Sequence, residues 1–449
     1  MFECKLVASK RQTAFGPLCL LGHYLSQEGV LKPLSSVHIV QKSIKHSPTQ
    51  KLIDALMGIL SGCKALYEID VRVCPDAPLQ RAFGRERCAD QSTIQRILNA
   101  FTPENVAQLR QAVEAIGRRY SATFSHDFER EMLVVEVDLT GLRASKRAEG
   151  STKGYFSGER NATGRQLLRV SVPQYKEILF EKLYAGNTTS CEVLKESIRE
   201  LERILSLAEE RQKRRRTLVR LDGGFGTDAN LNWLMWRGYE FIAKGYGGKR
   251  ANKLAKSVPE DGWRQGPTKS QLLGVPARAH RYARKSKTVV RRWVDEKGKP
   301  HTDYLVCSLH ELGPAQIAKL YDARGAMETD IKGDKRGLGI EKRRKKSFHA
   351  QEALVLLAQL SHNLLVYFKR WFLEGSAAAK LGVERLVREV LAMVAEVRVG
   401  KISGKVRLKL PYHHPWAKAV ASGIETHYPR NGWPYYLAPK LGDSASILW

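Results

Sequence analysis

Residues 133–141 read LVVEVDLTG and residues 217–227 read TLVRLDGGFGT, and these two stretches decide the fold. Each begins with aliphatic, β-branched residues and is bounded by glycine, which is the pattern of a buried strand. Each predicted strand ends at an aspartate, Asp138 in the first stretch and Asp222 in the second. Because the carboxyl ends of neighbouring strands meet at one edge of an α/β sheet, we expect the two carboxylates to converge there.

The neighbouring sequence continues this pattern. Strands are also predicted at Gln166–Val172 and Tyr239–Lys244, and helices at about Ser190–Gln212 and Asp228–Trp236. Strands that alternate with helices in this way favour an α/β core. The glycines that follow each aspartate leave room for a large ligand to approach the backbone.

A third acidic position lies in residues 321–335, YDARGAMETDIKGDK. On one continuous helix from Pro314 to about Asp334, at about 100° per residue, four side chains share a stripe about 60° wide. They are a phenol, a guanidinium, a carboxylate and an ammonium: Tyr321, Arg324, Glu328 and Lys335. Such a stripe suits a metal ion and phosphate groups. The alternative is a solvated row of charge pairs.

Other acids compete for the role of metal ligand. Glu136 lies two residues before Asp138 on the same face of the strand. Asp330 and Asp334 follow Glu328, but Asp330 lies about 200° around the helix from it.

Residues 1 to about 129 show helical periodicity, with one amphipathic helix expected at Gln50–Leu60. A second helix is expected to start at Ser92, after the capping residues of the sequence DQST. With Leu79–Phe83 as a preceding helix, this would be a helix-turn-helix that faces DNA. Its DNA-facing residues would be Thr93, Gln95 and Arg96. The alternative is an ordinary helical subdomain whose polar residues face water.

Residues 249–310 are basic and rich in turn signals, and we expect a β-rich insertion in the core. One hairpin is predicted there, with Thr288–Val294 paired to Asp303–Leu309. A further helix is expected at about Ala350–Leu373. The stretch Val397–Leu410 alternates between apolar and basic residues, which predicts a hairpin with its turn at Ser403–Gly404.

The composition favours a nucleic-acid partner. Among 449 residues there are 75 Lys plus Arg against 46 Asp plus Glu, a formal net charge of +29. A surface this basic attracts polyanions. No apolar run approaches the ~18 residues of a spanning helix, so no membrane partner is expected. The seven cysteines are scattered without a CxxC pair, which favours free thiols in a reducing cytoplasm.

The spacing Tyr-x₂-Arg-x₃-Glu-x₆-Lys, filled by Tyr321, Arg324, Glu328 and Lys335, resembles the YREK signature of a large group of bacterial insertion-sequence DDE transposases. The contexts VDLTG, LDGGF and LKLPYHHPW are similar to that group as well. The resemblance covers roughly residues 130–420.

The resemblance implies a ribonuclease-H-like catalytic core with a β-rich insertion, preceded by a helical DNA-binding domain. Asp138, Asp222 and Glu328 would hold two Mg²⁺ ions, for which Mn²⁺ can substitute. Two such metals stabilise the attacking and leaving oxygens of an in-line displacement. Side chains in two groups would contact DNA. Tyr321, Arg324 and Lys335 would hold phosphates of the transposon end, and Trp263 and Trp293 would stack on a displaced base.

The expected domains follow from this resemblance. They are a helical N-terminal DNA-binding domain (1–129), the first part of the core (130–248), the basic insertion (249–312), the second part of the core with the last acid (313–375), and a C-terminal helix and β-hairpin (376–449).

The implied activity is DNA strand cleavage and strand transfer, by cut-and-paste, at the ends of an insertion sequence. The expected partners are double-stranded DNA, as terminal inverted repeats and as target, and a second copy of the chain on that DNA. The expected location is the cytoplasm of a bacterium, in association with the nucleoid. Two alternatives are a ribonuclease-H-like nuclease that does not join strands and a DNA-binding regulator in which the acids are incidental.

Overall fold

The computed structural model describes residues 10–41, 45–156, 159–268, 270–399, 406–430, 436–441 and 444–448. The chain divides into two compact units. The helical unit comprises Met1–Ser121 and Asp330–Trp449, and the sheet unit comprises Ala122–Thr329.

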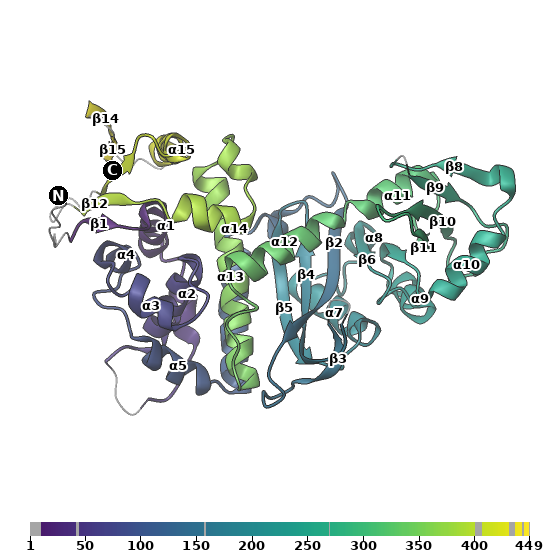
Figure 1. Ribbon diagram of the computed structural model, residues 1–449, viewed down its shortest axis with the longest axis horizontal. Coiled ribbons are helices and arrows are strands. Elements are labelled where there is room, and N and C mark those ends of the chain that lie inside the picture. The colour runs from purple at the N-terminus through teal and green to yellow at the C-terminus, as the bar shows by residue number, and fades with distance from the viewer. Residues whose placement is uncertain are drawn as a thin grey trace. The chain divides into compact units, whose positions relative to one another are not determined.

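The sheet unit is built on a mixed sheet of ten strands (Figure 1). The strand order is β3-β4-β2-β6-β7-β11-β10-β9-β8, and β5 also pairs with β4. In this sheet β6 runs parallel to both β2 and β7, and the other described pairs are antiparallel. The strands are β2 Leu133–Arg143, β3 Thr152–Phe156, β4 Glu159–Val172, β5 Glu177–Ala185, β6 Thr217–Leu221, β7 Glu240–Lys244, β8 Trp263–Gln265, β9 Gln271–Gly274, β10 Lys287–Val294 and β11 Pro300–Cys307.

Helices pack against this sheet, so the unit has the mixed α/β architecture that the sequence predicts. Helix α7 contacts β2, and α9 contacts β7. The apolar stripe of α7, with Val193, Ile198 and Leu201, is buried in one cluster with Val135 and Val137 of β2. Burying each such side chain stabilises the fold by about 1.5–3 kcal/mol. The helices are α7 Ser190–Ile204, α8 Arg211–Arg215, α9 Asp228–Arg237, α10 Gly248–Lys256 and α11 Pro314–Asp322.

The predicted helix at Ser190–Gln212 is too long. Helix α7 ends at Ile204, and Ser206 has a φ of 54°, which no helix accommodates. A separate short helix, α8, follows before β6.

Strands β3 and β5 are absent from the sequence-based prediction. The pattern of β5, EILFEKLYA, includes an acidic residue that usually marks an exposed position. In the structure Glu181 is fully buried, because the guanidinium of Arg169 on β4 donates to it at 2.7 Å. A buried ion pair therefore hides this strand from pattern analysis.

The predicted hairpin of the basic segment has the right strands but the wrong register. Strand β10 pairs with β11 so that Val294 lies opposite Pro300. The predicted pairing placed Val294 opposite Asp303, three residues later in the chain. The turn is tight because the Asp295 carboxylate accepts hydrogen bonds from the backbone N–H of Lys297 (3.0 Å) and Lys299 (2.9 Å). Since β11 also pairs with β7, the hairpin extends the central sheet.

The helical unit packs several helices around α13, the long green helix of Figure 1. Helix α13 contacts α2, α5, α6 and α15. The helices predicted at Gln50–Leu60, Ser92 and Ala350–Leu373 are all present, with starts within two residues of prediction. The helices are α1 Gly16–Gln27, α2 Pro48–Leu60, α3 Tyr67–Arg72, α4 Ala77–Ala82, α5 Gln91–Asn99, α6 Pro103–Tyr120, α13 Phe348–Phe372, α14 Val383–Arg385 and α15 Ala417–Arg430.

A second sheet belongs to the helical unit, in the order β1-β12-β13-β15-β14. The predicted hairpin forms its centre, and Val406, Leu408 and Leu410 are buried as expected. Its predicted turn, Ser403–Gly404, lies outside the described residues. The strands are β1 Gln12–Thr13, β12 Ala395–Val399, β13 Val406–Pro411, β14 Tyr436–Leu441 and β15 Ser444–Leu448.

The six cysteines in the described ranges are free thiols, and Cys4 lies outside those ranges. Among the described helices, none is both long enough and apolar enough to cross a membrane.

A buried ion pair fixes residues 84–89 to helix α2. The Arg85 guanidinium donates to both carboxylate oxygens of Asp54, at 2.8 and 3.1 Å, and both side chains are nearly inaccessible to solvent. The backbone N–H of Ala89 donates to the same carboxylate at 2.8 Å. One carboxylate thus anchors two points of the loop between α4 and α5.

We expect Asp54→Ala to lower the free energy of unfolding by about 3–5 kcal/mol, because it leaves the Arg85 charge buried without a partner. Urea unfolding followed by circular dichroism measures this. The control is Glu210→Ala, which removes a solvent-exposed pair with Lys213 and should cost at most about 1 kcal/mol. Equal losses in the two variants would contradict this view of the loop.

Candidate active site

Asp138 and Asp222 lie side by side on adjacent strands. The last parallel pair between β2 and β6 is Val137 with Leu221, so Asp138 is the next residue of β2 and Asp222 directly follows the end of β6. Strand β2 does not end there as predicted. It continues to Arg143, because β4 pairs with it beyond the end of β6, with Asp138 opposite Arg169. The predicted convergence of the two acids at one edge of the parallel ladder is nevertheless present.

Glycine shapes the turn that follows Asp222. The Asp222 carboxylate accepts a hydrogen bond from the backbone N–H of Gly224 at 3.0 Å. A Cβ on Gly226 would lie 2.0 Å from the carbonyl oxygen of Lys244, so only glycine fits. Beside the turn is a cavity of about 350 Å³. Its lining includes backbone of Gly223, Gly224, Gly245, Gly247 and Gly248, with Lys244 and Asp303.

One buried guanidinium pairs with Asp138 and acts on Asp222 through its charge. Arg324 Nη2 is 2.6 Å from Asp138 Oδ1, and Arg324 is only 6% exposed. Burial raises the pKa of Asp222, the charge of Arg324 opposes this, and the charge of Asp138 adds to it. Arg324 therefore balances the repulsion between two carboxylates that are close together and partly removed from water.

The continuous helix predicted from Pro314 to Asp334 is wrong. Helix α11 ends at Asp322, and helix α12 begins at Gly325 and runs to Gly337. Between them the backbone N–H of Arg324 donates to the carbonyl of Tyr321 at 2.9 Å. This bond spans three residues, as in a 3-10 turn, whereas an α-helical bond spans four. Glycine at 325 favours a break, and the ion pair with Asp138 holds Arg324 inward. The four predicted residues therefore do not lie along one straight helix.

Tyr321 is held by a second buried arginine. The Arg291 guanidinium lies 4.9 Å from the centre of the Tyr321 ring, a cation–π contact. Arg291 also donates to both carboxylate oxygens of Asp303 (2.8 and 2.7 Å) and to Asp322 at 2.6 Å. Burial raises the pKa of Tyr321 to about 12, so this phenol stays protonated.

Glu328 and Lys335 have different environments. The Glu328 carboxylate is 61% exposed and lies 3.7 Å from Arg324. Lys335 belongs to the helical unit, where its ammonium lies 3.2 Å from Glu341. In the part of the chain that the structure describes, no three His, Cys, Asp or Glu side chains are close enough to hold a metal ion together. Asp138 and Asp222 are thus brought together directly, and Glu328 joins them only through Arg324.

The competing acids have other partners. Glu136 is fully buried and forms an ion pair with Arg220, whose Nη1 also donates to the carbonyl of Leu320 at 2.9 Å. Asp334 is fully buried in the helical unit, 2.8 Å from His362 Nδ1. Asp330, in α12, is half-buried in the same unit.

The predicted DNA-contacting residues occupy separate places. On α5, Arg96 is exposed, Thr93 and Gln95 are half-buried, and Gln95 donates to Asn99 at 2.6 Å. Trp263 on β8 lies under the Arg292 guanidinium at 4.2 Å. Trp293 on β10 stacks on His301, with ring centres 5.3 Å apart. Both tryptophans are half-buried.

Pattern analysis did not identify Arg220, Arg291, Lys244 or Asp303. Lys244 lies 3.2 Å from Asp303, which it shares with Arg291. One signal in the sequence could have predicted the pair of Arg291 and Asp303, because both lie on strands of the predicted hairpin. The predicted register of that hairpin was wrong and did not place the two residues opposite each other, as they are in the structure.

Comparison with known proteins gives one family. A family model described as "Transposase DDE domain group 1" matches residues 30–427. No curated protein matches the sequence. One similar solved structure is the cryo-EM structure of the piggyBac transposase synaptic complex with hairpin DNA. It is 12% identical, and the match covers 97% of this chain and 90% of that chain with a TM-score of 0.45.

We expect Gly226→Ala to lower the free energy of unfolding of the sheet unit by about 1–3 kcal/mol, because its Cβ forces the turn away from Lys244. Gly223→Ala is the matched control, since the nearest atom to its Cβ is Lys244 Cγ at an ordinary 3.5 Å. Thermal unfolding of the two variants measures the difference. Similar melting temperatures for both would mean that the turn is not confined as described.

Proposed function

Because the chain belongs to the DDE transposase family, we propose that it cuts DNA strands at the ends of an insertion sequence and joins the free ends to target DNA in a Mg²⁺-dependent reaction. The observation that supports this most is the pair Asp138 and Asp222 at one sheet edge, with Arg324 against them. A pure DNA-binding protein would gain nothing from acids at this place, because each weakens its hold on phosphate.

The carboxylate oxygens of Asp138, Asp222 and Glu328 are the type of ligand that a hard divalent cation prefers. Mg²⁺ takes oxygen ligands, usually one or two carboxylates together with substrate phosphates. Burial and the charge of Asp138 both raise the pKa of Asp222, so a positive charge beside Asp222 stabilises its ionised form. We propose that Asp138, Asp222 and Glu328 hold two Mg²⁺ ions, with Mn²⁺ as a substitute. Bound there, the metal supplies charge stabilisation for the attacking and leaving oxygens at phosphorus.

The chain's own residues would position the substrate. Arg324 offers a fork that binds two phosphate oxygens once it is released from Asp138. In this proposal the phenolic O–H of Tyr321 donates a hydrogen bond to a phosphate oxygen, and Lys335 contributes a second cation. The glycine-lined cavity beside Asp222, about 350 Å³, has room for a phosphate group next to the acids. Trp263 and Trp293 would stack on a displaced base.

We also propose roles for the individual domains, a transposase group, a location and an oligomeric state. We propose a ribonuclease-H-like core formed by residues 130–248 and 313–375, a DNA-contacting insertion at 249–312, and a DNA-binding role for residues 1–129, including Thr93, Gln95 and Arg96. Residues 376–449 would form a separate C-terminal helix and β-hairpin. The YREK signature supports membership of the bacterial insertion-sequence group. We propose that the element moves by cut-and-paste. The protein would then be cytoplasmic and associated with the nucleoid. Pairing of two ends implies a homodimer on DNA.

The test uses purified full-length protein, DNA that carries the ends of its element, and Mg²⁺. We expect the wild type to cut and join, and Asp138→Asn, Asp222→Asn and Glu328→Gln each to lose at least about 100-fold in both steps while they still bind the DNA, since electrostatic stabilisation of this kind is worth that much. Gel assays score binding, cleavage and joining on the same samples.

The matched control is Asp228→Asn, which neutralises an acid six residues after Asp222 that pairs with Arg250. It should cut and join like the wild type. Normal cutting by the three acid variants would contradict the assignment of the site. Cutting without joining by the wild type would favour a nuclease, and binding without cutting under any divalent ion would favour a DNA-binding regulator.

A further inference from the structure

A large cavity of about 720 Å³ lies in the helical unit and has no part in the proposed chemistry. Its walls come from residues 39–41, 45, 46 and 51, from residues 87, 88 and 90, and from helix α5. Four cationic side chains line it: Lys45, Lys51, Arg87 and Arg96. Two acids, Asp70 and Asp90, also line it, so the cations outnumber the carboxylates by two.

Hydrogen bonds to the backbone engage both acids. Asp90 caps α5 and accepts from the backbone N–H of Thr93 at 2.7 Å. Asp70 accepts from the backbone N–H of Gln91 at 2.7 Å. Lys45 and Arg87, by contrast, are exposed, and in the described ranges neither forms an ion pair. With four cations and two carboxylates, the cavity lining carries a net positive charge.

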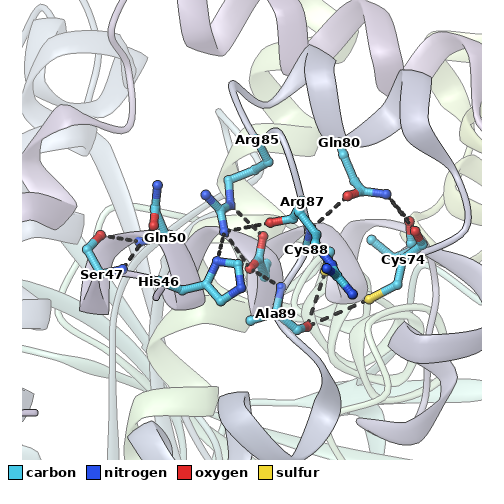
Figure 2. Close-up of polar contacts among 11 residues, drawn as sticks. His46, Ser47, Gln50, Cys74, Gln80, Arg85, Arg87, Cys88 and Ala89 are labelled. Carbon is cyan, nitrogen blue, oxygen red and sulfur yellow. Dashed lines mark hydrogen bonds and ion pairs between the residues drawn. The ribbon is translucent and has the colours of Figure 1, made fainter. Parts of the chain in front are cut away.

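Hydrogen bonds hold the backbone of the wall that carries Arg87 (Figure 2). The buried Arg85, fixed by Asp54, donates to the carbonyl of Arg87 at 3.0 Å. Gln80 connects the two sides of the loop, because it donates to the carbonyl of Cys74 (2.6 Å) and accepts from the N–H of Cys88 (2.7 Å). Arg87 thus projects from a backbone that is held on both sides.

His46 adds an uncharged donor. Arg85 Nη2 lies 3.1 Å from His46 Nδ1. An arginine can only donate, so Nδ1 accepts and the ring proton is on Nε2. Burial lowers the pKa of His46, and the charge of Arg85 lowers it further, so the ring stays neutral. His46 lines the cavity, where its Nε2–H can donate to an anion.

From this geometry we propose that the cavity binds a phosphate of the DNA backbone, with Arg87 and Lys45 as its main contacts and His46 as a neutral donor. The proposal rests on the proposed function, which makes DNA the partner. A phosphodiester carries one negative charge and two acceptor oxygens. The guanidinium of Arg87 can donate to both oxygens, and the ammonium of Lys45 can pair with the charge. Apolar side chains of Ile39, Val40 and Ile97 in the same lining suit the sugar. Exposed Arg96 on α5, which lines the same cavity, is a further cation there.

The test measures how the affinity of the full chain for a fluorescent duplex of arbitrary sequence depends on salt. Each lost phosphate contact lowers the slope of log affinity against log salt by about 1. We expect Arg87→Gln to lower the slope by about 1, and Arg87→Gln combined with Lys45→Gln by about 2. Lys380→Gln is the matched control, since Lys380 is an exposed cation of the same unit outside the cavity, and its slope should equal that of the wild type.

An unchanged slope in the double variant would overturn the proposal, and so would an equal decrease in Lys380→Gln, which would mean general charge attraction. A free mononucleotide is a second probe. If the double variant lost mononucleotide binding but kept wild-type DNA binding, the ligand would be a free phosphate ester and the assignment to DNA would be wrong. These outcomes do not depend on cutting, so the proposal can fail while the transposase reaction stands, and the reverse also holds.

Discussion

The repulsion between two adjacent carboxylates is the constraint on which the sheet unit depends. Asp138 and Asp222 are next to one another because β2 and β6 run parallel up to Val137 and Leu221. Partial burial strengthens their repulsion, since charges interact more strongly away from water. The fold supplies a compensating charge from Arg324, 2.6 Å from Asp138. The interruption between α11 and α12 follows from this need, because Arg324 points inward from that turn.

The same principle organises the surroundings of the site. Buried arginines pair with buried acids: Arg220 with Glu136, and Arg291 with Asp303. Removing one member of such a pair leaves an uncompensated buried charge, so each pair resists rearrangement. Arg324 differs in its partners, because Asp138 and Glu328 are themselves the proposed metal ligands. A bound cation would take over its role and free its guanidinium for phosphate.

The sequence predicted much of this arrangement and missed particular parts. Both aspartates, the parallel strands that carry them, and helices α2, α5 and α13 follow from apolar periodicity and capping residues. The break at Ala323–Arg324 was missed because the residues fit one helical stripe, and only the long-range contact with Asp138 opposes it. Strand β5 was missed because Glu181 is neutralised by Arg169, which lies opposite it on strand β4. Ion pairs between distant residues leave no periodic signal in a single sequence.

The most direct test of the central claim is a titration of the full-length protein with Mn²⁺, with the free ion followed by electron paramagnetic resonance. We predict that the wild type binds Mn²⁺ and that a variant with both Asp138→Asn and Asp222→Asn binds it at least about tenfold more weakly, a loss of about 1.4 kcal/mol or more. Asp228→Asn should bind like the wild type. Unchanged Mn²⁺ binding in the double variant would show that the two aspartates do not form the metal site.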